Sequence, residues 1–338
     1  MGHRARIFAS LLKCEFEIHL RFRGFSKLAS ILDCYLFLES LRPQICYVFD
    51  MAYSGVLAGS LHRFWHRGKL IVDTGDAISD LARATGRTRL GCLLTSGLEQ
   101  LSFVAADQLI VRGSFHQELL SDRGFNVSWI PDGVELDLFR PSLAKKHPSI
   151  LMIGLVGSLI WNPLQQTCYG MELIELLSLL RDLPIRGVLI GDGSGLSYLK
   201  ERAKQLRVED RIDFLGYVPY SELPPHLNSW DICLSTQTND VPGQVRTTGK
   251  LPLYLACDRF VLASRVGEAS RILPPEMLVD YEGSSDPAYP QKLADRIRWL
   301  WQNRKLLELN GANRRLAETH FDYSLLARRL AEVVRSLL

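Results

Sequence analysis

The sequence predicts an α/β fold built on parallel β-sheets. Seven short apolar or β-branched runs have the length and composition of strands that are buried on both faces. Longer amphipathic stretches lie between them, such as GMELIELLSLLRDL (170–183) and SYLKERAKQLR (197–207). Alternation of this kind is typical of parallel sheets covered by helices. The seven runs are ICYVF (45–49), KLIVD (69–73), QLIVR (108–112), IGLVG (153–157), RGVLIG (186–191), ICLS (232–235) and RFVLAS (259–264).

Length and composition restrict the class of protein. The 338 residues are enough for two domains, and 47% apolar with 23% charged residues is a globular composition. The net charge of +3 gives no indication of a nucleic-acid partner. The seven Cys are scattered and odd in number, with no spacing that predicts a disulfide framework or a zinc site. Reduced thiols predict a cytoplasmic protein, and we expect neither a signal peptide nor a transmembrane helix.

One boundary between domains is predicted. The stretch FRPSLAKKHPSI (139–150) is rich in Pro, Lys and Ser and separates two series of strands and helices. Such composition is typical of a linker. We therefore expect a first domain over residues 1–143 and a second domain from residue 149.

The segment GQVRTTGK (243–250) combines two cations, two hydroxyls and a glycine before an apolar helix. Free N–H groups at a helix N-terminus attract phosphate, and an Arg can donate two hydrogen bonds to a diphosphate. This pattern makes Arg246, Thr247, Thr248, Gly249 and Lys250 candidates for phosphate binding. The alternative is a capped surface helix with solvated cations.

Several segments resemble, in order, the GT-B glycosyltransferases of the retaining family 4 type, also called glycosyl transferases group 1. They are WIPDGVELDLFRP (129–141), IGLVGSL (153–159), LIGDGSGLSYLKERAKQL (189–206), RIDFLGYVPYSELPPHLNSWDICLSTQ (211–237) and KLPLYLACDRFVLASRVGEA (250–269). The resemblance implies two Rossmann-like domains facing across a cleft. It implies a nucleotide-sugar donor held mainly by the second domain, residues 149–321. It also implies that the last helix, 322–338, packs back on the first domain.

The resemblance also implies roles for particular residues. Arg246 and Lys250 would clamp the leaving diphosphate. Asp76 is a catalytic candidate on a different ground, its position at the end of a predicted strand, from which it could orient the acceptor. The remaining donor contacts would come from Gly157, Ser158, Gly191, Gly193, Gly216, Tyr217, Val218, Thr247, Thr248 and Gly249. For GDGSGL (191–196) the alternative is a turn that needs glycine freedom. For Tyr217 the alternative is packing on the domain core.

Other polar residues lie at predicted strand ends, where open α/β sheets bind ligands. Asp50, Tyr53, Asp73 and Asp76 could contact acceptor hydroxyls, although Asp at such places also caps turns and helices. In GSLIWNPLQQTCYG (157–170), Trp161, Asn162 and Gln166 would either cover the cleft mouth or form an ordinary loop anchored by the Trp. His3 is interpreted as a surface residue.

The sequence departs from the family pattern at three places. Val245 and Leu253 stand where many members have two Glu, eight residues apart. The usual Arg and Lys after the GLVGS strand are absent. The family's opening strand and Gly-rich loop have no clear equivalent, so either the first sheet is one strand short or the true start lies upstream.

Three functions follow from these observations. The first is a retaining glycosyltransferase that uses a nucleotide diphosphate sugar and a hydroxyl acceptor, with no further cofactor and no required metal. The second is a non-catalytic GT-B-like subunit that supports a partner glycosyltransferase. The third, resting on GDGSGL alone, is a nicotinamide-dependent oxidoreductase.

The first 27 residues are basic and partly apolar, which suggests peripheral contact with the inner face of a membrane. The alternative is a solvated helix face. The cations concerned are Arg4, Arg6, Lys13, Arg21, Arg23 and Lys27.

Overall fold

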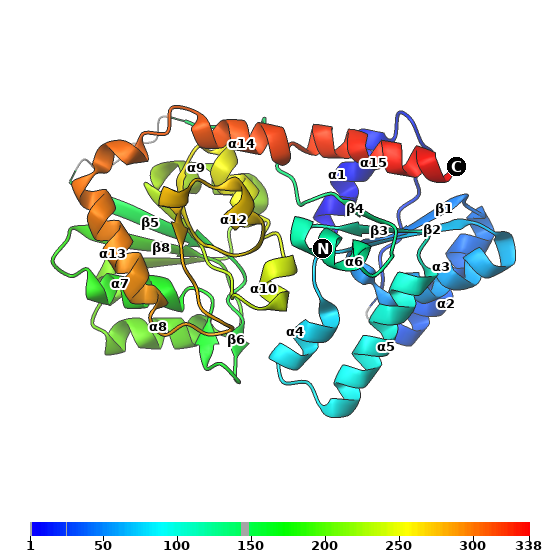
Figure 1. Cartoon of the computed structure of the whole chain (residues 1–338), viewed down its shortest axis with the longest axis horizontal. Coiled ribbons are helices and arrows are strands. Elements are labelled where there is room, and N and C mark those ends of the chain that lie inside the picture. The colour runs from blue at the N-terminus through cyan, green and yellow to red at the C-terminus, as the bar shows by residue number, and fades with distance from the viewer. Residues whose placement is uncertain (1, 25, 143–148) are drawn as a thin grey trace. The chain divides into compact units, whose positions relative to one another are not determined.

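The computed structural model describes residues 2–24, 26–142 and 149–338, and the chain divides into two compact units. Unit 1 contains the residues up to Gly133 together with Val245–Thr247 and Tyr323–Leu338. Unit 2 contains Val134–Gln244 and Thr248–Asp322. Each unit has one main parallel sheet with helices on it, so the predicted α/β class is confirmed (Figure 1).

Unit 1 is built on a four-stranded sheet of order β1-β2-β3-β4, in which all neighbours are parallel. The side chains of β2 alternate between its two cores: Ile71 packs with α1 and α15, and Val72 packs with the helices of the other face. The strands are β1 (Ile45–Val48), β2 (Lys69–Thr74), β3 (Gln108–Val111) and β4 (Val127–Trp129). The helices are α1 (His3–Leu12), α2 (Lys27–Leu41), α3 (Tyr53–His66), α4 (Ile78–Ala84), α5 (Arg89–Ala105), α6 (Ser114–Ser121) and α15 (Tyr323–Leu337), with a 3-10 turn η1 (Phe49–Met51).

The last helix, α15, is held in unit 1 by a narrow apolar stripe. Its buried residues are Tyr323, Leu326, Ala327, Leu330 and Ala331, which follow the spacing of one helical face. The Tyr323 ring meets the Phe8 ring of α1 edge-on, with centroids 5.6 Å apart. Helical spacing in the sequence suggests Leu325, Leu330 and Val334 for this face. Only Leu330 of these three is fully buried, because the stripe is centred one residue away from the position of Leu325.

A buried carboxylate at the end of β2 joins several elements of unit 1. The Asp73 side chain is fully buried and accepts hydrogen bonds from Arg4 Nε at 3.0 Å, the Tyr47 hydroxyl at 2.9 Å and Arg112 Nε at 3.2 Å. Arg4 also donates from Nη2 to the Ile130 carbonyl at 2.7 Å. Burial acts to raise the pKa of Asp73, but the two guanidinium groups and the Tyr47 hydroxyl outweigh it and hold the pKa below its usual range.

Unit 2 is built on a six-stranded sheet of order β12-β11-β10-β5-β8-β9, again parallel throughout. Its central strands are buried on both faces, which explains their continuous apolar sequences. The strands are β5 (Leu151–Val156), β8 (Ile185–Ile190), β9 (Ile212–Gly216), β10 (Ile232–Ser235), β11 (Phe260–Ser264) and β12 (Leu278–Val279), with a small hairpin of β6 (Trp161–Asn162) and β7 (Thr167–Cys168).

The helices of unit 2 follow its strands in sequence. They are α7 (Met171–Leu179), α8 (Leu196–Gln205), α9 (Leu223–Ser229), α10 (Val241–Val245, whose last residue groups with unit 1), α11 (Lys250–Ala256), α12 (Gly267–Ile272), α13 (Tyr289–Gln302) and α14 (Ala312–His320). The 3-10 turns are η2 (Glu209–Arg211), η3 (Tyr220–Glu222), η4 (Pro275–Met277) and η5 (Arg304–Leu307).

All seven predicted strands form, and the strands that the sequence analysis did not predict are short or lie at sheet edges. The division between the units falls at Gly133, whereas the sequence placed it at residue 143. The reason is that Val134 donates its N–H to the Phe321 carbonyl at 2.8 Å, and Val134 and Phe139 are buried in the core of unit 2. Most of the predicted linker, residues 143–148, lies outside the described residues.

The basic start of the chain is only partly a surface. Arg4 is buried in the Asp73 network, so it is not available to a membrane, which corrects its place among the predicted surface cations. Arg21 is exposed but forms an ion pair with Asp33. Arg6, Lys13 and Arg23 are exposed, and the Lys27 side chain lies outside the described residues. None of the described helices is long and apolar enough to cross a membrane.

We expect Asp73→Asn to lower the free energy of unfolding by about 3–5 kcal/mol, because it removes the fully buried counter-charge of Arg4 and leaves only the partly exposed Asp132, 3.3 Å away. Urea unfolding at neutral pH measures the loss. Asp213→Asn is the matched control: Asp213 pairs with Arg186 at 3.1 Å, but both side chains are 40% or more exposed, so its loss should stay within about 0.5 kcal/mol.

The free energy of unfolding should depend on pH through Asp73, and the direction of this dependence follows from its pKa. Because folding lowers the pKa of Asp73, its contribution to stability is present above the unfolded value of about 3.9 and is lost as the pH falls through the lower folded value. In the acidic range, the free energy of unfolding should therefore fall less steeply with decreasing pH in Asp73→Asn than in the unchanged protein. Equal losses in the two variants at neutral pH would contradict this account.

Candidate functional site

The candidate site lies at the carboxyl edge of the unit 2 sheet. β5 is the first strand of this sheet in the chain, and its two neighbours are β8 and β10. The chain goes first to β8 on one side and later to β10 on the other side. A reversal of this kind leaves a crevice at the carboxyl ends of the strands, where open α/β sheets bind ligands.

Four predicted glycines meet at this edge. The Gly157 N–H donates to the Ile190 carbonyl at 3.0 Å, and the Gly191 N–H donates to the Gly216 carbonyl at 2.8 Å. The chain is so close here that a Cβ on Gly191 would lie 1.9 Å from the Gly157 oxygen, and a Cβ on Gly193 would lie 2.4 Å from the Leu159 oxygen. Gly191 and Gly193 also have positive φ, 148° and 151°. Glycine is therefore required at positions 191 and 193. The exposed side chains of Ser158, Asp192 and Ser194 lie at the same edge, and Asp192 Oδ1 accepts the Gly193 N–H at 2.7 Å.

Lys250 supplies a positive charge beside these glycines. It begins α11, and its Nζ lies 3.5 Å from the centroid of the Tyr169 ring, a cation–π contact. The Tyr169 hydroxyl donates to the Leu234 carbonyl at 3.3 Å, which fixes the ring at the end of β10. A Cβ on Gly157 would lie 3.8 Å from Lys250 Nζ. The ammonium group thus lies at the carboxyl end of β5.

A buried carboxylate accompanies this lysine. Glu172, at the start of α7, accepts the Gly170 N–H at 2.8 Å. Burial raises the pKa of Glu172 above its usual value, although the Gly170 N–H and Lys250 favour the charged form. The sequence analysis did not identify Tyr169 and Glu172. Lys250 lies about eighty residues later in the chain, and nothing in the local sequence indicates that these residues are close to it in the fold.

The remaining donor candidates of unit 2 lie around the same edge. The Thr248 hydroxyl lies 3.4 Å from the Ser235 hydroxyl at the end of β10, and Gly249 is the N-cap of α11. Ser158 is exposed, and Val218 packs partly on the core. Tyr217 is 76% exposed, so it does not pack on the domain core, which was the alternative considered for it.

Arg246, Thr247 and Asp76 belong to unit 1. Arg246 pairs with Asp76, with 2.6 Å between Nη2 and Oδ1, and the two side chains are 42% and 41% exposed. Thr247 is buried and donates its hydroxyl to the Arg112 carbonyl. The segment predicted to bind phosphate as one group is therefore shared: Val245–Thr247 group with unit 1, and Thr248–Lys250 group with unit 2.

The other predicted acidic residues of unit 1 are engaged within the protein. Asp73 is buried and hydrogen-bonded on both oxygens, which corrects its assignment to acceptor binding. Asp50 is exposed and forms an ion pair with Arg112. Tyr53 is partly buried at the start of α3, and His3 is exposed at the start of α1. The sequence analysis did not predict that Arg4 and Arg112 form ion pairs with these carboxylates, because the partners are distant in the chain.

A histidine of unit 1 was also missed. His116 on α6 is buried, which lowers its pKa to about 4, with Asp76 opposing the shift. The ring is consequently neutral at neutral pH. It is a candidate for orienting groups around Asp76, although the fragment RGSFHQ by itself contains no motif.

The loop after β5 is anchored by stacking. The Trp161 ring stacks on the Tyr198 ring with centroids 4.1 Å apart and an interplanar angle of 8°. The Asn162 side chain donates to Gln165 and accepts the Leu164 N–H at 3.0 Å. Gln166 has a positive φ of 48° at the turn of the hairpin. These contacts favour the interpretation of an ordinary loop anchored by Trp161.

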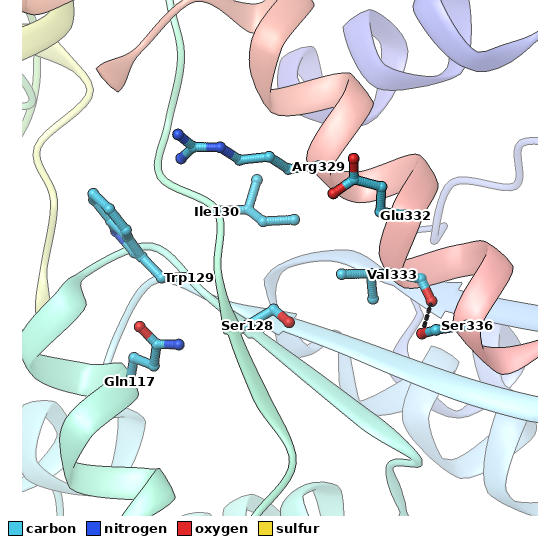
Figure 2. A pocket seen from close by; sticks show the side chains of 8 residues that line it. All are labelled: Gln117, Ser128, Trp129, Ile130, Arg329, Glu332, Val333 and Ser336. Carbon is cyan, nitrogen blue, oxygen red and sulfur yellow. Dashed lines mark hydrogen bonds between the residues drawn. The ribbon is translucent and has the colours of Figure 1, made fainter. Parts of the chain in front are cut away.

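A separate hollow of about 380 Å³ lies in unit 1 (Figure 2). Side chains of β4 and α6 face those of α15 across it, and the Ser336 hydroxyl donates to the Val333 carbonyl at 2.8 Å. Its lining residues are Gln117, Ser128, Trp129, Ile130, Arg329, Glu332, Val333 and Ser336. None of the predicted site residues lines it.

Comparison with known proteins agrees with these features. Residues 151–303 match the family model described as glycosyl transferases group 1, and the match includes the glycine edge and Lys250. A phosphatidylinositol N-acetylglucosaminyltransferase subunit of Arabidopsis thaliana is 25% identical over 163 residues, which cover 47% of this chain and 34% of that protein. The α-monoglucosyldiacylglycerol synthase of Streptococcus pneumoniae is 28% identical over 148 residues, which cover 40% and 34%. The chain thus spans about a third of the length of these curated relatives.

Solved structures show the fold. Sucrose-phosphate synthase from Thermosynechococcus elongatus superposes with a TM-score of 0.72 at 16% identity, covering 99% of this chain and 79% of that chain. Anabaena HepE in complex with UDP-glucose superposes with a TM-score of 0.72 at 17% identity, covering 97% and 88%. The chain therefore has the GT-B fold with two Rossmann-like domains, and residues 151–303 of its second unit are similar to the glycosyl transferases group 1 family.

We expect Gly191→Ala to lower the free energy of unfolding by at least about 2 kcal/mol, from the backbone clash together with the positive φ. Gly249→Ala is the matched control, because its φ is −57° and a Cβ there meets nothing within 4 Å. Chemical denaturation of both variants measures the difference. If Gly191→Ala were as stable as Gly249→Ala, the close approach of β5 and β8 described above would be wrong.

Proposed function

We propose that the protein transfers a sugar from a nucleotide diphosphate sugar to a hydroxyl acceptor, with retention of anomeric configuration. The observation that carries the proposal is the glycine-lined carboxyl edge with Lys250 beside it, inside a segment that matches the glycosyl transferases group 1 model. Anabaena HepE was solved with UDP-glucose, and its fold is that of this chain. No cofactor besides the donor is required.

The donor diphosphate would lie along the backbone of Gly157, Ser158, Gly191 and Gly193. Ser158 and Gly193 are exposed, so a bulky anion can approach the main chain at these two residues. The bound anion would have to lie away from the exposed Asp192 carboxylate, which accepts the Gly193 N–H. Lys250 Nζ would provide the compensating charge, which offsets the low number of cations in the loop after β5. The nucleobase would lie against Gly216, Tyr217 and Val218, where the exposed Tyr217 ring offers a surface for stacking.

The roles proposed for Arg246 and Asp76 require that a bound diphosphate replaces Asp76 as the ion-pair partner of Arg246. Their ion pair is about two-fifths exposed on each side, and such pairs contribute only about 0–1 kcal/mol. A diphosphate could therefore take Arg246 from Asp76 at little cost. Arg246 is four residues from Lys250 in the sequence, and we assign both cations to the same diphosphate. The released Asp76 carboxylate would then be able to orient an acceptor hydroxyl.

The proposed mechanism is a front-face displacement without a required metal. The acceptor oxygen attacks the anomeric carbon on the side from which the diphosphate leaves, and the acceptor proton passes to the leaving phosphate oxygen. Lys250 and Arg246 stabilise the charge that grows on the diphosphate. Since the leaving group itself takes the proton, no separate protein base is needed. The anomeric configuration of the product, measured by NMR, tests the stereochemistry.

A second candidate function is that of a non-catalytic subunit. Val245 and Leu253, which replace the Glu pair of many family members, are both buried apolar residues. No carboxylate is therefore available at these positions to hold a donor ribose. One relative is named as a subunit of its enzyme. Donor binding without turnover, either alone or until a partner is added, would favour this candidate.

The proposed acceptor carries its hydroxyl on a lipid or lipid-linked saccharide, with the chain held peripherally at the inner face of a membrane. The names of both curated relatives refer to lipids. In unit 1, a hollow of about 840 Å³ has a largely apolar lining from α1, α2 and residues 16–23. Exposed apolar side chains, Leu11, Leu20 and Phe22, lie beside exposed cations, Arg6, Lys13 and Arg23. This combination suits an anionic lipid surface.

We expect Lys250→Ala to weaken nucleotide diphosphate binding by about 1.5–3 kcal/mol, which is roughly ten- to hundredfold, and to change nucleoside binding little. A thermal-shift panel of nucleotide diphosphate sugars identifies the donor, and titration gives the affinities. The matched control is Lys200→Ala, because Lys200 also lies over an aromatic ring of unit 2, that of Phe214, on the exposed helix α8.

Arg246→Ala should produce a loss of similar size. If either variant weakened nucleoside and nucleoside diphosphate binding equally, its assignment to the phosphates would be incorrect. A panel in which no nucleotide sugar raised the melting temperature would oppose both candidate functions.

We expect the chain to co-sediment with anionic vesicles at low salt and to be released by high salt. The triple variant Arg6→Glu, Lys13→Glu, Arg23→Glu should bind at least about a hundredfold more weakly, since each cation near the surface contributes about 1 kcal/mol. Lys200→Glu, Lys204→Glu, Arg207→Glu reverses three exposed charges of unit 2 and serves as control. Equal loss in both triple variants would mean that net charge alone is responsible.

A further inference from the structure

Two helices of unit 1 bring together two histidines and a glutamate outside the proposed sugar-transfer site. His62 and His66 are four residues apart on α3, so they lie on one face of that helix. Glu39 comes from the neighbouring helix α2. The ligand-type atoms of these three side chains all lie within 4.8 Å of one another, and among residues 2–24, 26–142 and 149–338 this is the one group of three with that property.

The protonation of His62 follows from its backbone partner. Its Nε2 lies 3.2 Å from the Pro43 carbonyl oxygen, which can only accept a hydrogen bond. Nε2 therefore carries a hydrogen, and Nδ1 is the nitrogen that can offer a lone pair to a metal ion. Gly68 lets the chain pass close to this contact, since a Cβ there would lie 3.2 Å from both the His62 ring and the Pro43 oxygen. A carbonyl that holds one ring nitrogen is how proteins orient histidine ligands of metals.

The other ring nitrogen of His62 has no hydrogen-bond partner. Nδ1 is buried, on a side chain that is only 1% exposed, and it points toward Glu39 Oε1 at 4.0 Å. The Glu39 carboxylate is an acceptor as well, so Nδ1 and Oε1 face each other at a distance too long for a direct hydrogen bond. Such an arrangement costs free energy unless a cation lies between the two groups.

His66 completes the group on the side of the solvent. Its Nε2 lies 2.8 Å from Glu39 Oε1 and 3.0 Å from Oε2, and the His62 and His66 ring centroids are 4.9 Å apart. Both His66 and Glu39 are 27% exposed, which leaves an entry path for an ion. In a tetrahedral zinc site the ligand atoms are about 3.3–3.5 Å apart. Small rotations of these two partly exposed side chains would bring the three atoms to that spacing.

We propose that Glu39, His62 and His66 form a binding site for a divalent transition-metal ion, best suited to Zn²⁺, with water as the fourth ligand. Two imidazole nitrogens and one carboxylate oxygen are the donor set that zinc accepts with an open position. The ion would tie α2 to α3 in unit 1. The site is independent of the proposed sugar transfer, which needs no metal. The sequence analysis indicated no zinc site because HRFWH (62–66) shows only two ligands, and the third lies 23 residues earlier.

The test uses the full chain, freed of metal by a chelator and then titrated with ZnCl₂ by calorimetry, with elemental analysis after dialysis. We expect one Zn²⁺ per chain and a rise in melting temperature that depends on Zn²⁺ concentration. His66→Gln and Glu39→Gln change the partly exposed ligands, so both variants should fold, which circular dichroism checks. Each should weaken Zn²⁺ binding at least about a hundredfold. Co²⁺ in the unchanged protein should give the visible absorption of a tetrahedral site.

The matched control is His19→Gln. His19 also lies beside a glutamate, with Nε2 2.9 Å from Glu17 Oε1, but both side chains are largely exposed. This variant should keep full Zn²⁺ affinity. Absence of stoichiometric binding would overturn the proposal and would mean that a proton on His62 balances Glu39 instead. Zn²⁺ binding that survives in both His66→Gln and Glu39→Gln, or that falls equally in His19→Gln, would identify an adventitious ion only.

Discussion

The Asp73 carboxylate is the constraint on which the organisation of unit 1 depends. It lies fully buried at the end of β2 and binds two guanidinium groups, one from α1 and one from the end of β3. A charge this deep is stable only while its partners remain, so α1, β1, β2 and β3 must assemble together. The same ion pairs explain why Arg4 and Asp73 cannot serve at a surface. The basic residues near the start of the chain therefore divide into one that builds the core and several that face solvent.

Unit 2 is organised by close packing of backbone instead of by buried charge. At the carboxyl ends of β5 and β8 the chain segments approach so closely that glycine is the residue that fits. Lys250, held over the Tyr169 ring, supplies a positive charge at this edge, and the exposed Asp192 supplies a negative one. Burial raises the pKa of the nearby Glu172 above its usual value, while the Gly170 N–H and Lys250 act in the opposite direction.

Unit 1 places histidines and carboxylates where their partners come from other elements. His62 has its tautomer set by the Pro43 carbonyl, and His116 is kept neutral by burial. Arg246 and Asp76 form an exposed pair whose partners are exchangeable, in contrast to the buried pairs of Asp73. The distinction is one of solvation: an exposed pair exchanges partners at small cost, whereas a buried pair does not.

The sequence by itself determined seven of the strands, since short runs of apolar or β-branched residues identify buried strands, and all seven predicted runs became strands. The edge strands β4, β9 and β12 and the short hairpin strands β6 and β7 were not predicted. It also determined the glycine positions Gly157, Gly191 and Gly193, because a turn that crowds backbone leaves a local signature. Tertiary structure alone decided which charges are buried and which residues pair with each other. Arg4 and Asp73 lie 69 residues apart, and Arg246 and Asp76 lie 170 apart. The physical reason is that periodicity reports the burial of an element through its own neighbours in sequence, whereas an ion pair or a metal ligand set depends on distances between elements that only the folded chain defines.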